Sequence, residues 1–269
     1  MTQPASQLAS PPPSTFVVAV TYVRGVVGDG LLVLWTIVLS LVILAVSAVG
    51  WKGVADATIL LWGRVVLWLF GVTVHLRGIE NFPLGKGSLV LFNHQSLFDI
   101  PVLYGTFRRR MRFGSKSELF KIPLFGPAMR SVGTLEIVRN DRAATLRIYR
   151  KAESMFAQGF SFALAPEGTR QDEPRIGRFK AGPFLFAIGA QASIVPAVIK
   201  GAHEVLPKKR LVPNVGRWKS VVELTLLPAI STAGMTESDV GSLIDRVRNA
   251  MVTSFNGESS EPATVTRQS

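Results

Sequence analysis

The sequence predicts an α/β fold with a mixed, largely parallel sheet flanked by helices and an N-terminal membrane-attached helical segment. Three observations predict it. From residue 72 onward, short apolar runs typical of buried strands alternate with helical patterns. One of these helical patterns, residues 118–131, is punctuated by Pro and Gly. Ahead of this region, residues 31–49 form a long uncharged stretch, which is typical of a helix in lipid.

Composition divides the chain into four segments. Residues 1–14 are rich in Pro and Ser and predict a disordered N-terminus. Residues 15–71 predict a membrane-anchoring helical segment, and residues 72–256 predict one folded catalytic domain. The polar residues 257–269 predict a flexible tail.

The apolar N-terminal segment contains two different stretches. A helix over residues 31–49 would span roughly 28 Å, close to the ~30 Å hydrocarbon core of a bilayer. The alternative is a buried core helix, but no polar residues mark a solvent face. Residues 54–71 are interrupted by Asp56 and Arg64, and a charge at mid-span is costly. This stretch predicts an interfacial or re-entrant helix, which leaves open one membrane span or a re-entrant helical pair.

The catalytic domain is expected to alternate strands and helices. Strands are predicted at 72–76, 88–92, 112–115, 135–138, 161–165, 194–199 and 221–227. Helices are predicted at 97–110, 118–131, 141–158, 181–191 and from Thr236 to about 254. Catalytic groups in α/β domains tend to lie where strands end and loops begin.

Charge and rare residue types narrow the chemistry. The net charge of +12 suits an anionic partner, which could be nucleic acid, an acidic membrane leaflet or a phosphorylated substrate. The chain has no cysteine, so disulfides and thiolate nucleophiles are excluded. HExxH, GxSxG, Walker A and strand-linked GxGxxG motifs are absent. These absences predict no metal site, and they give no support to a serine hydrolase or a nucleotide-binding fold. Of the three histidines, His75 and His203 are expected to be structural.

The remaining histidine, His94, follows the apolar run 88–92. Asp99 is five positions later, and five helical residues rotate by about 140°, so the two cannot share a face of one helix. They can meet if His94 lies in the turn and Asp99 in the first helical turn, with Ser96 as N-cap. The carboxylate would then hold the imidazole in the tautomer that leaves one nitrogen free as a base. Alternatively, Ser96 and Asp99 form a capping box and His94 is an ordinary loop residue.

Other polar candidates also follow apolar runs. The sequence APEGTR (165–170) supplies a carboxylate, a flexible Gly and Arg170. Arg139 follows the run 135–138, and Lys116 follows RFGS. Each cation alone could be a solvated surface charge. Together, at the ends of neighbouring strands, they would converge on one edge of the sheet and suit a phosphate.

Several blocks of the sequence resemble the glycerolipid acyltransferases, the group of 1-acylglycerol-3-phosphate acyltransferases. The similar blocks, in the family's order, are NHQSLFD (93–99), GTLEIVR (133–139), PEGTR (166–170) and IVPAVI (194–199). The linking segments SKSELFKIPLFG (115–126) and FKAG (179–182) are also similar. The resemblance covers roughly residues 72–228. Two departures, Glu136 in place of an aromatic residue and Ala165 in place of Phe, bear on substrate identity more than on the reaction.

The resemblance implies roles for the matching residues. His94 would be the general base that deprotonates the acceptor hydroxyl, and Asp99 would orient and stabilise it. Lys116, Arg139 and Arg170 would hold the acceptor's phosphate. The site-shaping positions would be Glu167 and Gly168. Because the chain has no cysteine and no serine elbow, we expect direct transfer without an acyl-enzyme.

The resemblance also implies substrates and location, and it implies no bound cofactor or metal. The donor would be an acyl thioester, acyl-CoA or acyl-carrier protein, and the acceptor would be 1-acylglycerol 3-phosphate, giving phosphatidic acid. Other lysophospholipids, glycerol 3-phosphate or a lyso-amino-acid lipid are alternative acceptors. We expect an anionic membrane as partner, no nucleic acid, and an active site facing the cytoplasm. A non-enzymatic membrane or nucleic-acid binding protein is the competing hypothesis.

Overall fold

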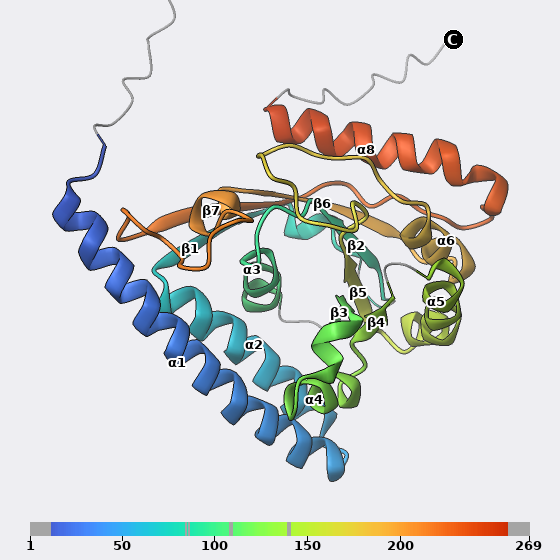
Figure 1. Ribbon diagram of the computed structural model, residues 1–269. Coiled ribbons are helices and arrows are strands. Elements are labelled where there is room, and N and C mark those ends of the chain that lie inside the picture. The colour runs from blue at the N-terminus through green and yellow to red at the C-terminus, as the bar shows by residue number, and fades with distance from the viewer. Residues whose placement is uncertain (1–11, 84, 86, 108–109, 139–140, 258–269) are drawn as a thin grey trace, which may run out of the picture.

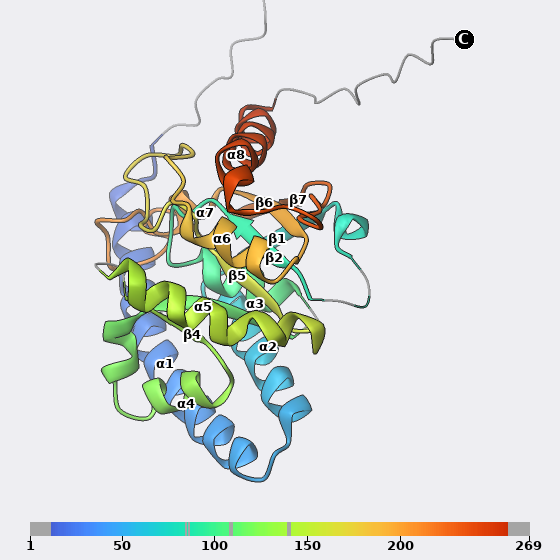
Figure 2. The same cartoon turned by 90° about the vertical axis from the view of Figure 1, so that its right-hand side faces the viewer.

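The computed structural model describes residues 12–257 except 84, 86, 108–109 and 139–140 (Figure 1). A seven-stranded mixed sheet lies between helices on both of its faces (Figures 1 and 2). This arrangement confirms the predicted α/β fold with a largely parallel sheet. Most of the segments predicted to be a disordered N-terminus and a flexible tail lie outside the described residues.

The sheet has one antiparallel pair. The strands are β1 (Val72–Arg77), β2 (Leu89–Phe92), β3 (Met111–Lys116), β4 (Leu135–Ile137), β5 (Ser161–Leu164), β6 (Ile194–Lys200) and β7 (Ser220–Leu226). Their order is β1-β7-β6-β2-β5-β3-β4, and β6 with β7 is the antiparallel pair. All the other neighbours are parallel. The C-terminal ends of β2, β3, β4, β5 and β6 therefore meet at one edge of the sheet.

Eight α-helices lie within the described residues. They are α1 (Thr15–Ala48), α2 (Lys52–Leu69), α3 (Asp99–Thr106), α4 (Phe125–Ser131), α5 (Arg142–Ala157), α6 (Gly182–Gly189), α7 (Ala202–Val205) and α8 (Val240–Asn256). Short 3-10 turns lie at η1 (Ile79–Asn81), η2 (Ser117–Lys121) and η3 (Glu237–Asp239). The helix predicted over 118–131 is thus split into η2 and α4, because Pro123 and the positive φ of Leu124 interrupt it.

Alternation along β2 separates two hydrophobic cores. Val90 and Phe92 pack on the face covered by α2 and α3. Leu89 and Leu91 pack on the opposite face, against side chains of α5, α6 and α8. All four side chains are at most 2% exposed. Because both faces of the strand are buried, β2 reads as a continuous apolar run, as expected for a central parallel strand.

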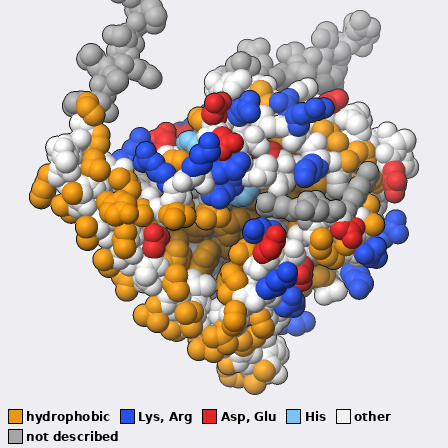
Figure 3. Space-filling model, in the orientation of Figure 1, with side chains coloured by type: hydrophobic (Ala, Val, Ile, Leu, Met, Phe, Trp, Pro, Cys, Tyr) orange, Lys and Arg blue, Asp and Glu red, His pale blue; other side chains and the backbone are white. Residues whose placement is uncertain are grey.

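Helix α1 is longer than the uncharged stretch that predicted it. It has 34 residues and extends over about 51 Å at 1.5 Å per residue. Within the described part of the chain it is the one helix long and apolar enough to cross a membrane. Only 11% of its most apolar window is buried, which argues against the alternative of a core helix. Exposed apolar side chains cover its outer side (Figure 3).

Helix α2 returns beside α1 and packs into the catalytic domain (Figures 1 and 2). Its Val66 and Leu67 belong to the core. Gly63 lies so close to α3 that a Cβ there would be 2.5 Å from the Gly105 nitrogen. The two charges that interrupt α2 find partners in the domain: Asp56 pairs with Arg112 at 2.6 Å, and Arg64 Nε donates to the Gly105 carbonyl at 3.2 Å.

Candidate active site

The turn after β2 is fixed to the neighbouring strand by a buried asparagine. Asn93 Nδ2 donates to the Ile199 carbonyl at 2.8 Å, and Asn93 Oδ1 accepts from the Ile199 amide at 2.7 Å. The Asn93 side chain is fully buried. Two bonds to one residue of β6 fix the place and the direction in which the chain leaves the sheet. The following residue, His94, is therefore presented at the C-terminal edge.

His94 and Asp99 form a close pair at this edge. The distance from His94 Nδ1 to Asp99 Oδ2 is 2.8 Å. Asp99 is fully buried, and the His94 side chain is 12% exposed. Asp99 Oδ2 also accepts from the amides of Gln95 at 2.9 Å and Ser96 at 3.0 Å. The carboxylate therefore orients the ring and shapes the turn that carries it.

Ser96 differs from the expectation that it caps the helix. Helix α3 begins at Asp99, and Phe98 precedes it without a side-chain cap. The Ser96 hydroxyl instead accepts from the Phe98 amide at 3.1 Å and donates to the Leu206 carbonyl at 2.9 Å. The N-cap prediction is wrong because helix α3 begins three residues after Ser96, whose hydroxyl bonds within the turn and to a carbonyl 110 positions away in the sequence. Asp99 uses its carboxylate mainly on the turn and the imidazole, which differs from a simple capping box.

Asp99 also selects the chemistry of the imidazole. A carboxylate that accepts a hydrogen bond from Nδ1–H leaves Nε2 as the nitrogen with the free lone pair in a neutral ring. His94 lines a cavity of about 470 Å³. Of the three histidines, all of which are described, only His94 lines this cavity. The arrangement places one basic nitrogen at a cavity wall.

Glu167 holds the main chain of His94 from the neighbouring loop. Its Oε1 accepts from the His94 amide at 3.2 Å, and the Gln171 amide donates to the His94 carbonyl at 2.8 Å. The Glu167 side chain is buried and does not line the cavity. The loop after β5 thus fixes His94 on both sides of its Cα. Glu167 contacts the main chain of His94 and does not reach the cavity. The resemblance implied a position in the acceptor site.

Burial raises the pKa of Glu167 to about 7. The amides of His94 and Gly177 and the side chain of Gln171 lower it, and the charge of Asp99 raises it further. Its Oε2 is buried without a hydrogen bond of good geometry from any described residue. A carboxyl group in this environment changes charge near neutral pH.

Gly168 allows a lysine to enter the site. Its φ is +72°, which favours glycine, and a Cβ there would lie 2.9 Å from Lys180 Nζ. The Lys180 amide donates to the Pro166 carbonyl at 2.8 Å. Both Gly168 and Lys180 line the 470 Å³ cavity. Sequence reasoning did not select Lys180, although the similarity of FKAG (179–182) to the family was available as a signal.

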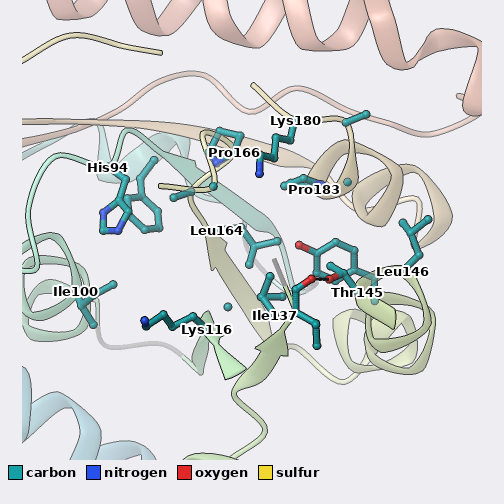
Figure 4. A pocket seen from close by; sticks show the side chains of 18 residues that line it. His94, Ile100, Lys116, Ile137, Thr145, Leu146, Leu164, Pro166, Lys180 and Pro183 are labelled. Atoms are coloured by element: carbon teal, nitrogen blue, oxygen red, sulfur yellow. Dashed lines mark hydrogen bonds between the residues drawn. The ribbon is translucent and has the colours of Figure 1, made fainter. Parts of the chain in front are cut away.

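Cationic groups face each other across this cavity. In Figure 4 the Lys180 side chain comes from above, beside Pro166, and Lys116 lies below. His94 stands to one side of the cavity, next to Ile100. Lys116 is exposed and lies 3.9 Å from Glu118. An anionic ligand in the cavity would therefore lie between two lysines and the imidazole.

The two predicted arginines are placed differently. Arg170 is partly exposed in the loop after β5 and does not line the cavity. Arg139 lies outside the described residues. Glu136, one of the departures from the family pattern, pairs with Arg130 at 3.2 Å. The other departure, Ala165, lines the cavity. Within the described ranges no group of three or more His, Asp or Glu could hold a metal, and a metal-free site stays a prediction.

A second cavity of about 400 Å³ lies between α1, α2, α3 and the η2–α4 region. Most of its wall is apolar and includes Trp62, Phe98 and Met129. Ile100 lines both cavities, so they adjoin beside the catalytic turn. Figure 3 shows a hollow within the apolar part of this face of the molecule.

The chain is similar to known acyltransferases. A family model described as Acyltransferase matches residues 73–200. The chain is 30% identical to 1-acyl-sn-glycerol-3-phosphate acyltransferase alpha of Mus musculus over 227 residues, which cover 82% of this chain and 77% of that protein. It is 28% identical to the beta enzyme of Homo sapiens over 208 residues, covering 77% and 73%.

A solved structure has the same fold. The 1-acyl-sn-glycerophosphate acyltransferase PlsC of Thermotoga maritima aligns with a TM-score of 0.76 at 20% identity, covering 92% of this chain and 99% of that one. The family match extends from β1 to β6, so this domain is an acyltransferase domain. At 30% identity over most of its length, the chain belongs to the family of 1-acyl-sn-glycerol-3-phosphate acyltransferases.

Proposed function

We propose that this protein transfers a fatty acyl group from an acyl thioester to the free hydroxyl of 1-acylglycerol 3-phosphate, which yields phosphatidic acid. The observation that carries the proposal is the His94–Asp99 pair, 2.8 Å apart, at the wall of a cavity that also contains Lys116 and Lys180. The names of the relatives support the choice of acceptor. Acyl-CoA and acyl-carrier protein are both proposed donors.

His94 acts as the base in this proposal. Its Nε2 takes the hydroxyl proton while the acceptor oxygen attacks the thioester carbonyl carbon. The tetrahedral intermediate then collapses: the carbon–sulfur bond breaks, and the leaving thiolate takes the proton back from His94. Asp99 stabilises the imidazolium that exists between these two steps. The acyl group passes directly from sulfur to oxygen, and the absence of cysteine is in keeping with this path.

The acceptor's phosphate is held by cations. Lys116 and Lys180 border the cavity and supply two positive charges. Arg170 and Arg139 stay proposed phosphate ligands, because an arginine can bind two phosphate oxygens at once. Glu167 is proposed to support the site through the His94 main chain. No metal or bound cofactor takes part in the proposed reaction.

The apolar cavity of about 400 Å³ is the proposed place for an acyl chain, since its wall offers few polar atoms. Helix α1 forms part of this wall through Leu32 and Leu39. An acyl chain could therefore pass between the bilayer and the catalytic turn without crossing water.

Membrane attachment is proposed to involve α1 and α2 together. Helix α1 touches the catalytic domain near both ends: Arg24 donates to the Trp218 carbonyl at 2.7 Å, and the hydroxyls of Ser47 and Ser131 lie 3.2 Å apart. A helix fastened in this way cannot cross a bilayer away from its domain. We therefore favour a re-entrant pair at the cytoplasmic surface, where acyl donors are present, over a single span.

The test is thioester release by purified protein against a matrix of acyl donors and lysolipid acceptors. We expect activity with 1-acylglycerol 3-phosphate, and His94→Ala should reduce it by roughly 10²–10⁴-fold. His75→Ala, an exposed change on β1, is the matched control and should keep wild-type activity. Full activity of His94→Ala would end the proposal. Preference for acceptors without a phosphomonoester would refute the phosphate-binding role of the cations.

A further inference from the structure

The loop between α7 and β7 carries an unusual exposed side chain. Leu211 is 88% exposed, more than any other large apolar side chain among the described residues. Residues 208–210, directly before it, are Lys, Lys and Arg. A single exposed leucine is common on protein surfaces, but Leu211 lines the 400 Å³ apolar cavity together with Leu32 and Leu39 of α1 and so extends a continuous apolar surface, which is typical of a site that a partner covers. Three cations beside it indicate that the partner is anionic.

Much of the basic charge in this loop is not neutralised within the protein. Lys208 lies 3.4 Å from Asp172. Lys209 and Arg210 are exposed, and neither forms an ion pair within the part of the chain that the structure describes. Two positive charges are thus available to an external ligand.

The same loop is fastened to α1. The Gly216 amide donates to Thr21 Oγ1 at 2.7 Å. A Cβ on Gly25 would lie 2.3 Å from Val212 Cγ1, so helix and loop touch closely there. Arg24 adds its bond to the Trp218 carbonyl. Because the loop and the apolar helix are joined at several points, the position of α1 in a bilayer sets the position of the loop.

The loop also borders the apolar cavity and the catalytic turn. Leu206 and Leu211 both line the 400 Å³ cavity, and the Leu206 carbonyl accepts the bond from Ser96 in the turn that contains His94. On the face shown in Figure 3, Lys and Arg side chains gather along the upper border of the apolar surface, directly above the hollow. The boundary between apolar and basic surface therefore passes close to the cavity.

We propose that residues 208–211 are a second membrane contact, in which Lys209 and Arg210 bind the phosphates of anionic phospholipids and Leu211 enters the acyl region beside the apolar cavity. This inference rests on the proposed membrane attachment of α1. It places the cavity mouth at the level where headgroups meet acyl chains, so a lysolipid can reach the catalytic turn while its chain stays in an apolar environment.

An acidic carrier protein would also be attracted to Lys209 and Arg210. Two observations favour lipid. Leu211 is an apolar group that lines the same cavity as Leu32 and Leu39 of α1. The loop is also in direct contact with α1, the helix that carries exposed apolar side chains, at Thr21 and Gly25. A basic residue near an anionic leaflet contributes about 1 kcal/mol, so removal of both charges should weaken the loop's contact by about 30-fold, and salt should do the same.

The test uses single labelling sites in a chain that has no cysteine of its own. Leu211→Cys carries an environment-sensitive fluorophore in full-length protein reconstituted into vesicles of phosphatidylglycerol and phosphatidylcholine. Leu34→Cys, on the exposed side of α1, reports the attachment of α1. Asn249→Cys, exposed on α8 across the sheet, reports a position in water. Quenchers attached to lipid acyl chains and aqueous iodide separate the two environments.

We expect acyl-chain quenchers to act on positions 34 and 211 and iodide to act on 249. Lys209→Gln with Arg210→Gln should expose position 211 to iodide and leave position 34 in lipid. The matched control, Arg150→Gln with Lys151→Gln on α5, removes the same charge from exposed positions and should change nothing. High salt or vesicles of pure phosphatidylcholine should act like the loop double variant.

The other outcomes are distinct. If position 34 is open to iodide, the proposed attachment of α1 fails. If position 34 is in lipid while 211 stays open to iodide, the inference is overturned and α1 attachment survives. A response of position 211 to acyl-carrier protein, with none to lipid, overturns it in favour of donor docking. If position 211 stays in lipid when Lys209→Gln and Arg210→Gln are both present, the role of Lys209 and Arg210 is overturned.

Discussion

Two carboxylates support the same histidine in different ways. Asp99, from the turn after β2, accepts a bond from the imidazole and from two amides of the turn. Glu167, from the loop after β5, accepts from the His94 main-chain amide instead. One acid acts on the reacting ring and the other on the backbone that carries it. Loss of the Asp99 carboxylate should therefore lower the rate of acyl transfer far more than loss of the Glu167 carboxylate.

The largest expected effect comes from Asp99→Asn. An asparagine amide can donate to Nδ1 and so favour the tautomer in which Nε2 carries the proton and cannot act as a base. We expect kcat/KM to fall by roughly 10²–10⁴-fold, measured by thioester release at saturating donor. Circular dichroism and vesicle binding should match the wild type. A kcat/KM within tenfold of wild type would show that Asp99, like Glu167, has no direct effect on the reacting imidazole.

The second effect concerns stability and follows from the pKa of Glu167. Burial raises this pKa from 4.5 to about 7, so the folded protein binds a proton that the unfolded chain releases between those values. The unfolding free energy should therefore fall as pH rises from about 4.5 to 7, by up to about 3 kcal/mol in total.

Glu167→Gln has no ionisable group at this position, so it is the reference for the pH dependence of the unfolding free energy. The difference in unfolding free energy between wild type and Glu167→Gln, measured by denaturant titration in detergent at pH 5 and pH 8, should favour the wild type more at pH 5. A difference that is the same at both pH values would show that Glu167 ionises normally.

A smaller effect is expected from Glu167 on the reaction itself. Glu167→Gln keeps an oxygen that can accept from the His94 amide, so kcat should stay within about threefold of wild type. Glu167→Ala leaves that amide without its partner, which costs about 1–3 kcal/mol and corresponds to roughly 5–150-fold in rate if the turn shifts. KM for the acceptor should change little in both variants. A large rise in KM would instead make Glu167 a substrate ligand.

The smallest effect is expected from Lys180→Gln, which touches neither acid's bond to His94. Loss of one of the cations at the cavity should raise KM for 1-acylglycerol 3-phosphate about fivefold at low salt and leave kcat within twofold. High salt should reduce the difference, since screening weakens the charge in the wild type as well. Arg147→Gln, exposed on α5, is the control. An unchanged KM would exclude Lys180 from the phosphate site.

Local patterns were sufficient for the strands and their ends, and therefore for the position of His94. The predicted runs 88–92 and 161–165 became β2 and β5 to within one residue at each end, because buried central strands leave a continuous apolar pattern. Contacts across long sequence distances were not readable. The Ser96 hydroxyl donates to the Leu206 carbonyl, 110 positions away. Lys180 lies against Gly168, and no local sequence pattern distinguishes it from an exposed lysine.

The helical N-terminus shows the same limit. The uncharged stretch 31–49 predicted only the C-terminal part of α1, which begins at Thr15. Arg24 is compatible with the helix because it donates to carbonyls of the distant loop at Arg217 and Trp218. These partners lie 193–194 positions away, so the local sequence does not reveal how the charge is accommodated.

The bond between Asn93 and Ile199 has a consequence for the order of assembly. The catalytic turn depends on a partner that is synthesised 106 residues later, and β2 itself pairs with β5 and β6, both downstream. A nascent chain that has not yet delivered β6 lacks the support that aims His94. Catalytic competence should therefore arise late and abruptly during folding, after the membrane helix has already left the ribosome.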